Sequence, residues 1–341
     1  MNNEIQQHFL RLYQQTFPQK EQIHIVTYTS ISTGWESDLF ALQLDCIEAN
    51  SRKSEGAILK LYHGDQGIQK AQREFQGLQH FAQSQYPVPE ALFAVLDTSP
   101  FGQACVAMEK IQGNTVADIF AVSSREKQRE LITQCCQLYV DLHALDWKPF
   151  VLDPTLYQTD SFIDSWLTET NTFVTQLQPL VFDPIFNWLQ KRSKEITCQR
   201  LSVTHGDFHT QNIIRKDDGT AFVIDWTGIA ISDYRFDLAW TLLLSSTLYS
   251  AEMSRAILAE YEHLMGHSVE HIEFFEVIAC TRRLFDITVS LNSGATALGM
   301  KSGAEETMRQ MIEHIRLVYA QLQKITGCSL PEIERLIMIL S

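Results

Sequence analysis

The alternation of apolar and polar positions predicts that the first third of the chain is rich in β-strands. In one segment Phe40, Leu42 and Leu44 alternate with more polar residues, which is the period of two expected of a half-buried strand. Turn-forming residues separate this segment from similar ones before and after it. The predicted strands are two within residues 23–46 and one each at 57–62, about 91–97 and about 103–109.

A helical period appears between the third and fourth strands and then dominates the rest of the chain. Apolar residues there recur at three- and four-residue intervals, which marks the expected buried face of a helix. From about residue 116 onward helices are predicted to dominate, and beyond Asp237 the chain is expected to be helical to its end. The face of the first helix comprises Ile68, Ala71, Phe75, Leu78 and Ala82, with Glu74 beside it.

Polar residues suited to phosphoryl transfer gather in two short segments. Asp207 and Asn212 lie in Thr204–Asn212, and Asp225 follows Asn212 by thirteen positions. Phosphoryl transfer with Mg²⁺ needs one carboxylate to orient the attacking hydroxyl, and an amide and a carboxylate oxygen to hold the metal. The pattern therefore favours a kinase-like phosphotransferase.

The same segment predicts a hairpin that would position these side chains. Strands are expected at 201–204 and 221–225, with Ile213–Ile214 between them and a turn at Lys216–Gly219. An Asp-Gly pair between apolar runs is a strong hairpin signal. Asp225 is thereby expected at the end of a strand.

The catalytic segment resembles that of the aminoglycoside phosphotransferase and choline kinase family, relatives of the protein kinases that phosphorylate small molecules. His205-Gly206-Asp207 stands where protein kinases carry His-Arg-Asp, and Ile224-Asp225-Trp226 where they carry Asp-Phe-Gly. The chain reads Ser232-Asp233-Tyr234-Arg235 where the family often has Gly-Asp-Pro. The resemblance implies an α+β, bilobal, protein-kinase-like fold, with a small antiparallel-sheet N-lobe and a larger, mainly helical C-lobe.

The resemblance also implies roles for individual residues. Asp207 matches the catalytic base, and Asn212 and Asp225 match the two residues that bind Mg²⁺. His205 is expected to brace the loop structurally. Asp237, in the helix that follows, is expected to order the same loop.

Residues of the first lobe are expected to bind the nucleotide, ATP or GTP. Lys60 is a cation among apolar neighbours, which is costly without a partner. The resemblance makes it the Lys that grips the α- and β-phosphates, with Glu74 as its partner. In the loop of residues 30–38, the resemblance implies phosphate contacts, for which Ser32, Gly34 and Ser37 are the candidates.

Met108–Gly113 resembles the hinge between the lobes, where backbone groups bind adenine. Glu109 and Ile111 are the corresponding candidates. The expected division of the chain is an N-terminal nucleotide-binding lobe at 1–111 and a C-terminal catalytic and substrate-binding lobe at 112–341.

The composition of the chain excludes some classes of binding partner. The 341 residues are 45% hydrophobic, which is enough for two lobes with apolar cores. A net charge of −14 argues against nucleic acid, which needs clustered Lys and Arg. No leader pattern or membrane span is predicted, and the seven Cys lack a Cys-x-x-Cys pair, so a cytoplasmic protein with reduced thiols is expected. The acidic balance suits a cationic acceptor, although Arg282-Arg283 would equally meet a carboxylate or a phosphate.

Alternatives to the kinase hypothesis come from two other classes. A noncatalytic nucleotide-binding regulator would share the fold without phosphoryl transfer. His205, Asp207 and His209 also form a His-x-Asp-x-His pattern that would suit a metal-dependent hydrolase. No pattern selects the acceptor among amino sugars, amino alcohols and hydroxy-amino acids, and none indicates the oligomeric state.

Overall fold

The computed structural model describes residues 2–31, 37–97, 101–177, 180–301 and 303–341. Two compact units emerge from its contacts. The first unit comprises residues 1–119, 211–229 and 299–301, and the second comprises 120–210, 230–298 and 302–341. The chain therefore passes between the units several times, and the lobe boundary expected at 111/112 stays a proposal.

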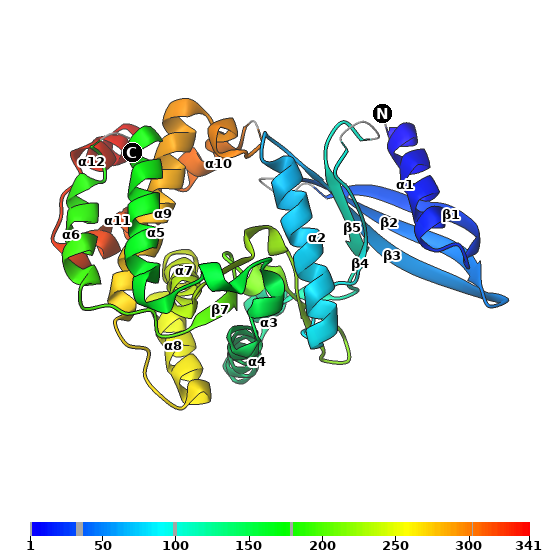
Figure 1. Ribbon diagram of the computed structural model, residues 1–341, viewed down its shortest axis with the longest axis horizontal. Helices are drawn as coiled ribbons and strands as arrows, with labels where there is room; N and C mark the ends of the chain where they lie inside the picture. The colour runs from blue at the N-terminus through cyan, green and yellow to red at the C-terminus, as the bar shows by residue number, and fades with distance from the viewer. Residues whose placement is uncertain (1, 32–36, 98–100, 178–179, 302) are drawn as a thin grey trace. The chain divides into compact units, whose positions relative to one another are not determined.

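An antiparallel sheet of five strands forms the centre of the first unit (Figure 1). Its strands lie in the order β1-β2-β3-β5-β4, so that β3 is the middle strand. The three longest strands are consecutive in sequence, as expected of antiparallel strands joined by short turns. The bounds are Glu21–Ile31 for β1, Ser37–Glu48 for β2, Ser51–Tyr62 for β3, Ala91–Val95 for β4 and Cys105–Glu109 for β5.

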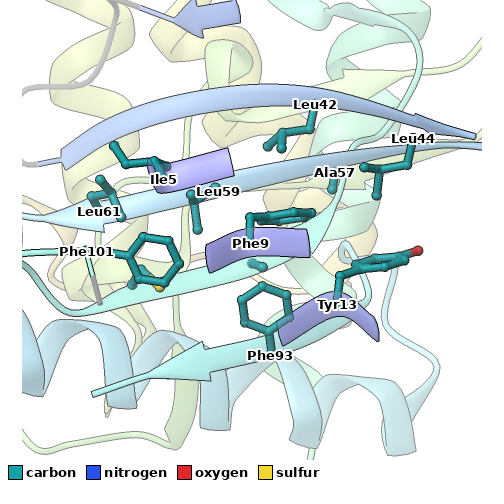
Figure 2. Packing of buried hydrophobic residues seen from close by; sticks show 12 residues of the cluster. Ile5, Phe9, Tyr13, Leu42, Leu44, Ala57, Leu59, Leu61, Phe93 and Phe101 are labelled. Carbon is teal, nitrogen blue, oxygen red and sulfur yellow. The ribbon is translucent and has the colours of Figure 1, made fainter. Parts of the chain in front are cut away.

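The helix α1, Asn2–Thr16, covers one face of this sheet (Figure 2). Ile5, Phe9 and Tyr13 recur every four residues and share one helical face, and all three are buried. They pack against alternate residues of the strands, among them Leu59 and Phe93. Burying an aromatic side chain of this kind contributes roughly 2–3 kcal/mol. The polarity of the N-terminal residues concealed this helix from the sequence analysis.

The helix α2, Gly67–Ser84, is present where predicted, but its buried face differs from the prediction. Ala71 and Leu78 are buried, whereas Ile68 is exposed. Glu74, expected at the side of the apolar stripe, is fully buried. The apolar spacing alone was misleading because a buried carboxylate occupies the middle of this helix's inner face.

A second, three-stranded sheet also belongs to the first unit. The order is β6-β8-β9, with β6 at Asn114–Thr115, β8 at Ile213–Arg215 and β9 at Ala221–Val223. Gly113 precedes β6 and lies against β8, where an added Cβ would come within 2.4 Å of the carbonyl oxygen of Arg215. Only glycine permits this approach of two backbones.

Helices dominate the second unit. A two-stranded antiparallel sheet accompanies them, made of β7, Leu201–Thr204, and β10, Ala230–Asp233. The α-helices are α4 at Arg125–Ala144, α5 at Thr159–Leu177, α6 at Asp183–Ser193, α7 at Tyr234–Leu248, α8 at Ala251–Met265, α9 at Ile272–Ser293, α10 at Ala304–Gln310, α11 at Ile312–Thr326 and α12 at Pro331–Leu340. A shorter helix, α3, spans Val116–Val122, where the two units join.

The predicted hairpin around the catalytic segment is partly wrong. The hairpin of β8 and β9 exists, but strand 201–204 pairs with β10 instead. Strand β9 also ends at Val223 rather than at Asp225. Strand pairing over long sequence separations depends on tertiary contacts, which local turn signals do not encode.

Among the described residues, no helix is both long and apolar enough to cross a membrane.

Candidate active site

Lys60 and Glu74 form a buried ion pair in the first unit. Lys60 is 4% exposed and Glu74 is 0% exposed. The Nζ of Lys60 donates a hydrogen bond to Oε2 of Glu74 at 2.9 Å. A buried ammonium requires a compensating charge, so this pair explains how β3 carries a cation among apolar side chains. The pairing is the one that the sequence predicts.

Three further donors surround the Glu74 carboxylate. The Tyr62 hydroxyl donates to Oε2, and the backbone N–H of Trp226 donates to Oε1 at 3.0 Å. The hydroxyl of Thr227 lies 3.3 Å from Oε2. Glu74 therefore ties α2 and β3 to the segment that follows β9, which is the arrangement of a positioning residue.

Lys60 also contacts Asp225. Its Nζ lies 2.6 Å from Oδ1 of Asp225 and 2.6 Å from Oγ1 of Thr227. Burial alone would lower the pKa of Lys60, but the negative charges of Asp225 and Glu74 outweigh burial and raise it. Lys60 consequently stays protonated at physiological pH and presents a positive charge beside Asp225.

The backbone around Asp225 brings it close to Asn212. Asp225 has φ 65° and ψ 65°, a left-handed conformation that costs a non-glycine residue about 1–2 kcal/mol. The N–H of the preceding Ile224 donates to the carbonyl oxygen of Asn212 at 2.9 Å. The side chain of Asp225 is 47% exposed. Carboxylate and amide oxygens are the ligands that Mg²⁺ prefers, so the chemistry of Asn212 and Asp225 fits this metal.

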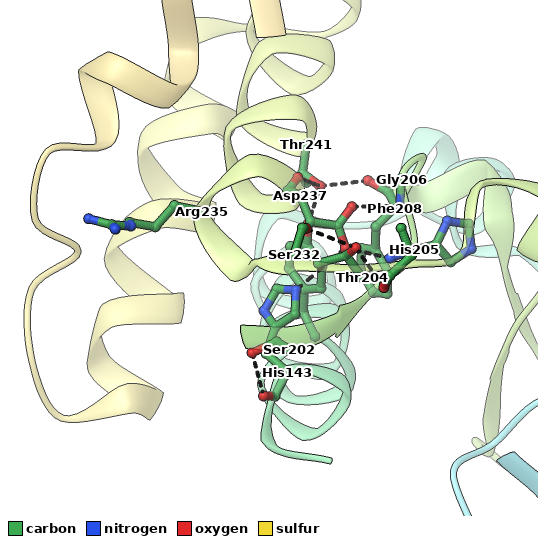
Figure 3. Close-up of polar contacts among 12 residues, drawn as sticks. His143, Ser202, Thr204, His205, Gly206, Phe208, Ser232, Arg235, Asp237 and Thr241 are labelled. Carbon is green, nitrogen blue, oxygen red and sulfur yellow. Dashed lines mark hydrogen bonds and ion pairs between the residues drawn. The ribbon is translucent and has the colours of Figure 1, made fainter. Parts of the chain in front are cut away.

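In the second unit, Asp237 holds the turn that leads to Asp207 (Figure 3). Asp237 lies in the first turn of α7, and its carboxylate accepts hydrogen bonds from the N–H of His205 at 2.7 Å and of Gly206 at 2.8 Å. A buried carboxylate that accepts backbone hydrogen bonds is stabilised in its ionised form. Although burial would raise the pKa of Asp237, the hydrogen bonds from His143 and from the backbone N–H of His205 lower it.

His205 and His143 are both buried beside this turn. The N–H of Asp207 donates to Nδ1 of His205 at 3.2 Å. His143 lies between the hydroxyl of Tyr261, 2.8 Å from Nδ1, and the carboxylate of Asp237, 3.4 Å from Nε2. Their positions explain why two histidines occur in an otherwise apolar region, since each ring satisfies a buried polar group.

Asp207 is held from two sides. The Nε1 of Trp240 donates to Oδ1 at 2.8 Å, and Nε2 of His209 lies 3.3 Å from Oδ2. Partial burial would raise the pKa of Asp207, but the interactions with His209 and Trp240 and the charge of Arg282 lower it well below its usual range. Its side chain remains 43% exposed. Asp207 is thus an oriented, ionised carboxylate that a substrate hydroxyl can reach.

The segment that departs from the family pattern is well ordered. Asp233 accepts a hydrogen bond from the N–H of Arg235 at 3.0 Å and thereby caps α7. The guanidinium of the same Arg235 is 2.7 Å from the Asp233 carboxylate, and both residues are fully buried. This ion pair fixes the start of the helix that carries Asp237.

The contacts of the other predicted nucleotide-binding residues do not indicate a role in binding. Ser32 and Gly34 lie outside the described residues. Ser37 is buried at the start of β2, opposite Tyr62. Glu109 ends β5, where its carboxylate lies 3.4 Å from the N–H of Glu90, and Ile111 is buried. Their roles in nucleotide binding stay proposals.

The sequence analysis missed three side chains that contact the candidate residues. Tyr62 lies two positions after Lys60, and Thr227 two positions after Asp225. Trp240 comes from a helix that follows the candidate segments. The spacing of Tyr62 on a strand was a usable signal, because alternate residues share a face. Nothing local indicated Thr227 or Trp240.

The His-x-Asp-x-His pattern has a different role in the structure. Nδ1 of His205 accepts the N–H of Asp207, and His209 pairs with the Asp207 carboxylate. In the part of the chain that the structure describes, no three His, Cys, Asp or Glu side chains group as metal ligands.

We expect Asp237→Asn to lower the free energy of unfolding by about 2–4 kcal/mol, since charged hydrogen bonds to two buried N–H groups are weakened. The effect should depend on pH. The folded-state pKa of Asp237 is lowered, so its contribution is complete above the unfolded pKa of about 3.9 and is lost as pH falls through the folded value. Chemical denaturation at pH 7 and below pH 4 tests this. An equal difference between wild type and variant at both pH values would contradict it.

Comparison with known proteins supplies a family. Residues 27–271 match the family model described as the phosphotransferase enzyme family. A curated relative, acyl-CoA dehydrogenase family member 10 of Mus musculus, is 25% identical over 198 residues, which is 56% of this chain. The chain spans only 18% of that relative's length, so the name of the whole mouse protein says little about this chain.

Solved structures share the fold. A Ralstonia eutropha protein named as an aminoglycoside phosphotransferase has a TM-score of 0.63 at 15% identity, covering 93% of this chain and 98% of that one. A phosphotransferase solved with GDP and kanamycin has a TM-score of 0.58 at 17% identity, with 92% and 98% covered. Another, solved with streptomycin and ATP, has 0.59 at 16%, with 84% and 92% covered. These likenesses confirm the predicted α+β kinase-like fold.

Proposed function

The chain belongs to the phosphotransferase enzyme family, and from that premise we propose that it transfers the γ-phosphate of ATP or GTP to a hydroxyl group of a small molecule. The observation that supports this most strongly is the buried Lys60, which is held by Glu74 and lies 2.6 Å from Asp225. A stabilising role alone does not require a protonated Lys beside a half-exposed carboxylate.

In the proposed reaction, Lys60 contacts the nonterminal phosphates and Glu74 fixes its position. Asn212 and Asp225 would hold Mg²⁺, and the bound ion would supply positive charge to the phosphate oxygens. Asp207 accepts a hydrogen bond from the acceptor hydroxyl and orients it toward the γ-phosphorus. The new bond forms between the hydroxyl oxygen and phosphorus while the bond to the β,γ-bridging oxygen breaks. The proton passes to Asp207 and the nucleoside diphosphate leaves.

The acceptor is proposed to be a small molecule, and its charge is a separate question. The net charge of −14 and the kanamycin and streptomycin found in two structures of similar fold favour a cationic acceptor. The side chains that surround Asp207 give direct information on the charge of the acceptor.

Each of the seven Cys is a free thiol, which supports a cytoplasmic location for the reaction.

The test combines nucleotide binding with phosphoryl transfer. Titration calorimetry with ATP and GTP should show binding that depends on Mg²⁺ and weakens in Asp225→Asn. Transfer of labelled γ-phosphate is then measured against amino sugars, amino alcohols, hydroxy-amino acids and hydroxycarboxylates. Binding without transfer to any acceptor would favour the noncatalytic regulator. Turnover without nucleotide, together with bound Zn or Fe, would favour the hydrolase.

A further inference from the structure

An anchored arginine lies next to the His205–Asp207 turn of the second unit, although the protein as a whole is acidic. Arg282, on α9, donates from Nη1 to the carbonyl oxygen of Gly206 at 2.9 Å. Its guanidinium carbon lies 4.0 Å from the centre of the Trp240 ring. Trp240 in turn donates to Asp207. Arg282 is therefore anchored to the residue before Asp207 and to the ring that orients Asp207.

The neighbouring Arg283 supplies a second cation. Its Nε donates to Nε2 of His314 at 2.9 Å, and His314 is buried in α11. Burial and the charge of Arg283 lower the pKa of His314 to about 4, so His314 is neutral at physiological pH and acts as an acceptor. The negative charges of Asp286 and, to a lesser extent, Asp207 stabilise the protonated form of Arg283. Asp286 therefore offsets part of the charge of Arg283.

Three glutamates of the second unit have partners of their own. Oε1 of Glu262 accepts the N–H of Val269 at 2.8 Å. Glu270 and Glu276 accept hydrogen bonds from the side chains of Gln199 and Gln321, at 3.0 Å and 3.2 Å. These carboxylates therefore have structural contacts that do not depend on a cationic acceptor.

Arg282 has the donor capacity to bind an anion. A guanidinium carries five N–H donors, and the Arg282 side chain is exposed apart from its contacts with Gly206 and Trp240. Its planar fork matches a carboxylate through two parallel hydrogen bonds. An ammonium group placed against Arg282 itself would meet a like charge, which opposes its binding there. The charges close to Asp207 determine the electrostatic interaction with the acceptor more than the net charge does, because charges beyond about 8–10 Å are screened at physiological ionic strength.

We propose that the acceptor is an anionic hydroxy compound, a hydroxycarboxylate in the simplest case, whose carboxylate binds Arg282 while its hydroxyl faces Asp207. This inference rests on the proposed phosphotransferase function and specifies its substrate class. Arg282 is then a specificity residue that contacts the substrate.

The experiment uses matched acceptors with the purified full chain and Mg-ATP. A series of hydroxycarboxylates of increasing length is compared with the primary amides and the amino alcohols of equal length. The carboxylates should be phosphorylated with kcat/KM values at least tenfold above those of their amides. In Arg282→Gln, KM for the best carboxylate should rise about 10- to 100-fold, and KM for its amide should change less than about threefold.

Two further variants separate substrate binding from support of the loop. Arg282→Lys keeps the charge but loses the fork, so an intermediate rise in KM is expected. Arg316→Gln, an exposed arginine of α11 paired with Glu313, should leave every constant unchanged. Calorimetric binding of the carboxylate in the presence of a nonhydrolysable ATP analogue should weaken in Arg282→Gln in proportion to KM.

Three outcomes would overturn the inference. Phosphorylation of amino alcohols or amino sugars but of no hydroxycarboxylate would leave the proposed function intact and reject the anionic acceptor. An equal loss of kcat for all acceptors in Arg282→Gln, with KM unchanged, would make Arg282 a support of the loop only. Mg-dependent ATP binding without transfer to any acceptor would reject the proposed function itself, and the substrate class with it.

Discussion

Replacing Asp207 with Asn is expected to reduce the rate of phosphoryl transfer by about 10²- to 10⁴-fold while nucleotide binding and folding stay unchanged. The amide keeps the size of the side chain but cannot receive the hydroxyl proton, and general base catalysis contributes an effect of this size. Asp207 is held by Trp240 and His209 rather than by the core, so stability should change little. Single-turnover transfer, calorimetry and thermal unfolding measure the three quantities.

The matched control for that experiment is Asp164→Asn. Asp164 is exposed on α5 in the same unit, and its substitution should leave the rate unchanged. Wild-type turnover in Asp207→Asn would remove the proposed base. A loss of ATP binding in the same variant would instead indicate that the substitution disturbs the nucleotide site.

Replacing Glu74 with Gln should lower the free energy of unfolding of the first unit by about 3–5 kcal/mol, because it removes the most deeply buried counter-charge of Lys60. The amide also cannot match every donor that now surrounds the carboxylate, namely those of Tyr62 and Trp226. Denaturant titration, with hydrogen exchange to assign the transition to the first unit, measures the loss.

A double-mutant cycle shows whether the pair itself causes this loss. Lys60→Met alone leaves the buried Glu74 carboxylate with neutral donors, whereas Lys60→Met combined with Glu74→Gln leaves no uncompensated charge. We expect the double variant to be about 1–3 kcal/mol more stable than the sum of the single losses implies. Lys53 and Glu48 form an exposed pair at 3.4 Å in the same sheet, and the corresponding cycle there should give less than about 1 kcal/mol. Additive losses at Lys60 and Glu74 would show that the two residues act independently.

The strands of the first unit were predictable because their signals are local. Alternation around Phe40 and Leu42 indicated β2, and turn-forming residues separated it from similar segments before and after it. The helix α1 was missed since its fully packed stripe consists of Ile5, Phe9 and Tyr13, and most of its other side chains are polar. A short apolar stripe within a polar segment predicts a buried helix only when the surface that it covers is known.

The candidate site was predictable where a single motif carried it and not where distant segments supplied it. Asp207, Asn212 and Asp225 lie within nineteen positions, so their spacing alone indicated phosphoryl transfer. The partner of Lys60 was implied by the family resemblance, which expects a Glu on the helix after the strand. Trp240 and Arg282 contact the His205–Asp207 turn from α7 and α9. These contacts depend on how α7 and α9 pack, and the spacing of residues in the sequence does not indicate that packing.

The division of the chain into units restricts how such a protein can be recombined. Residues 211–229, with Asn212 and Asp225, belong to the same compact unit as Lys60 and Glu74, although Lys60 and Asp225 are 165 positions apart in the sequence. A chimera of two relatives with one crossover near residue 111 would join Lys60 and Glu74 of one parent to Asp225 of the other. An exchange that keeps these contacts within one parent needs three crossovers, near residues 119, 211 and 229. Because the first unit is built from separate segments of the sequence, chimeras with a single crossover should lose function more often than chimeras with all three.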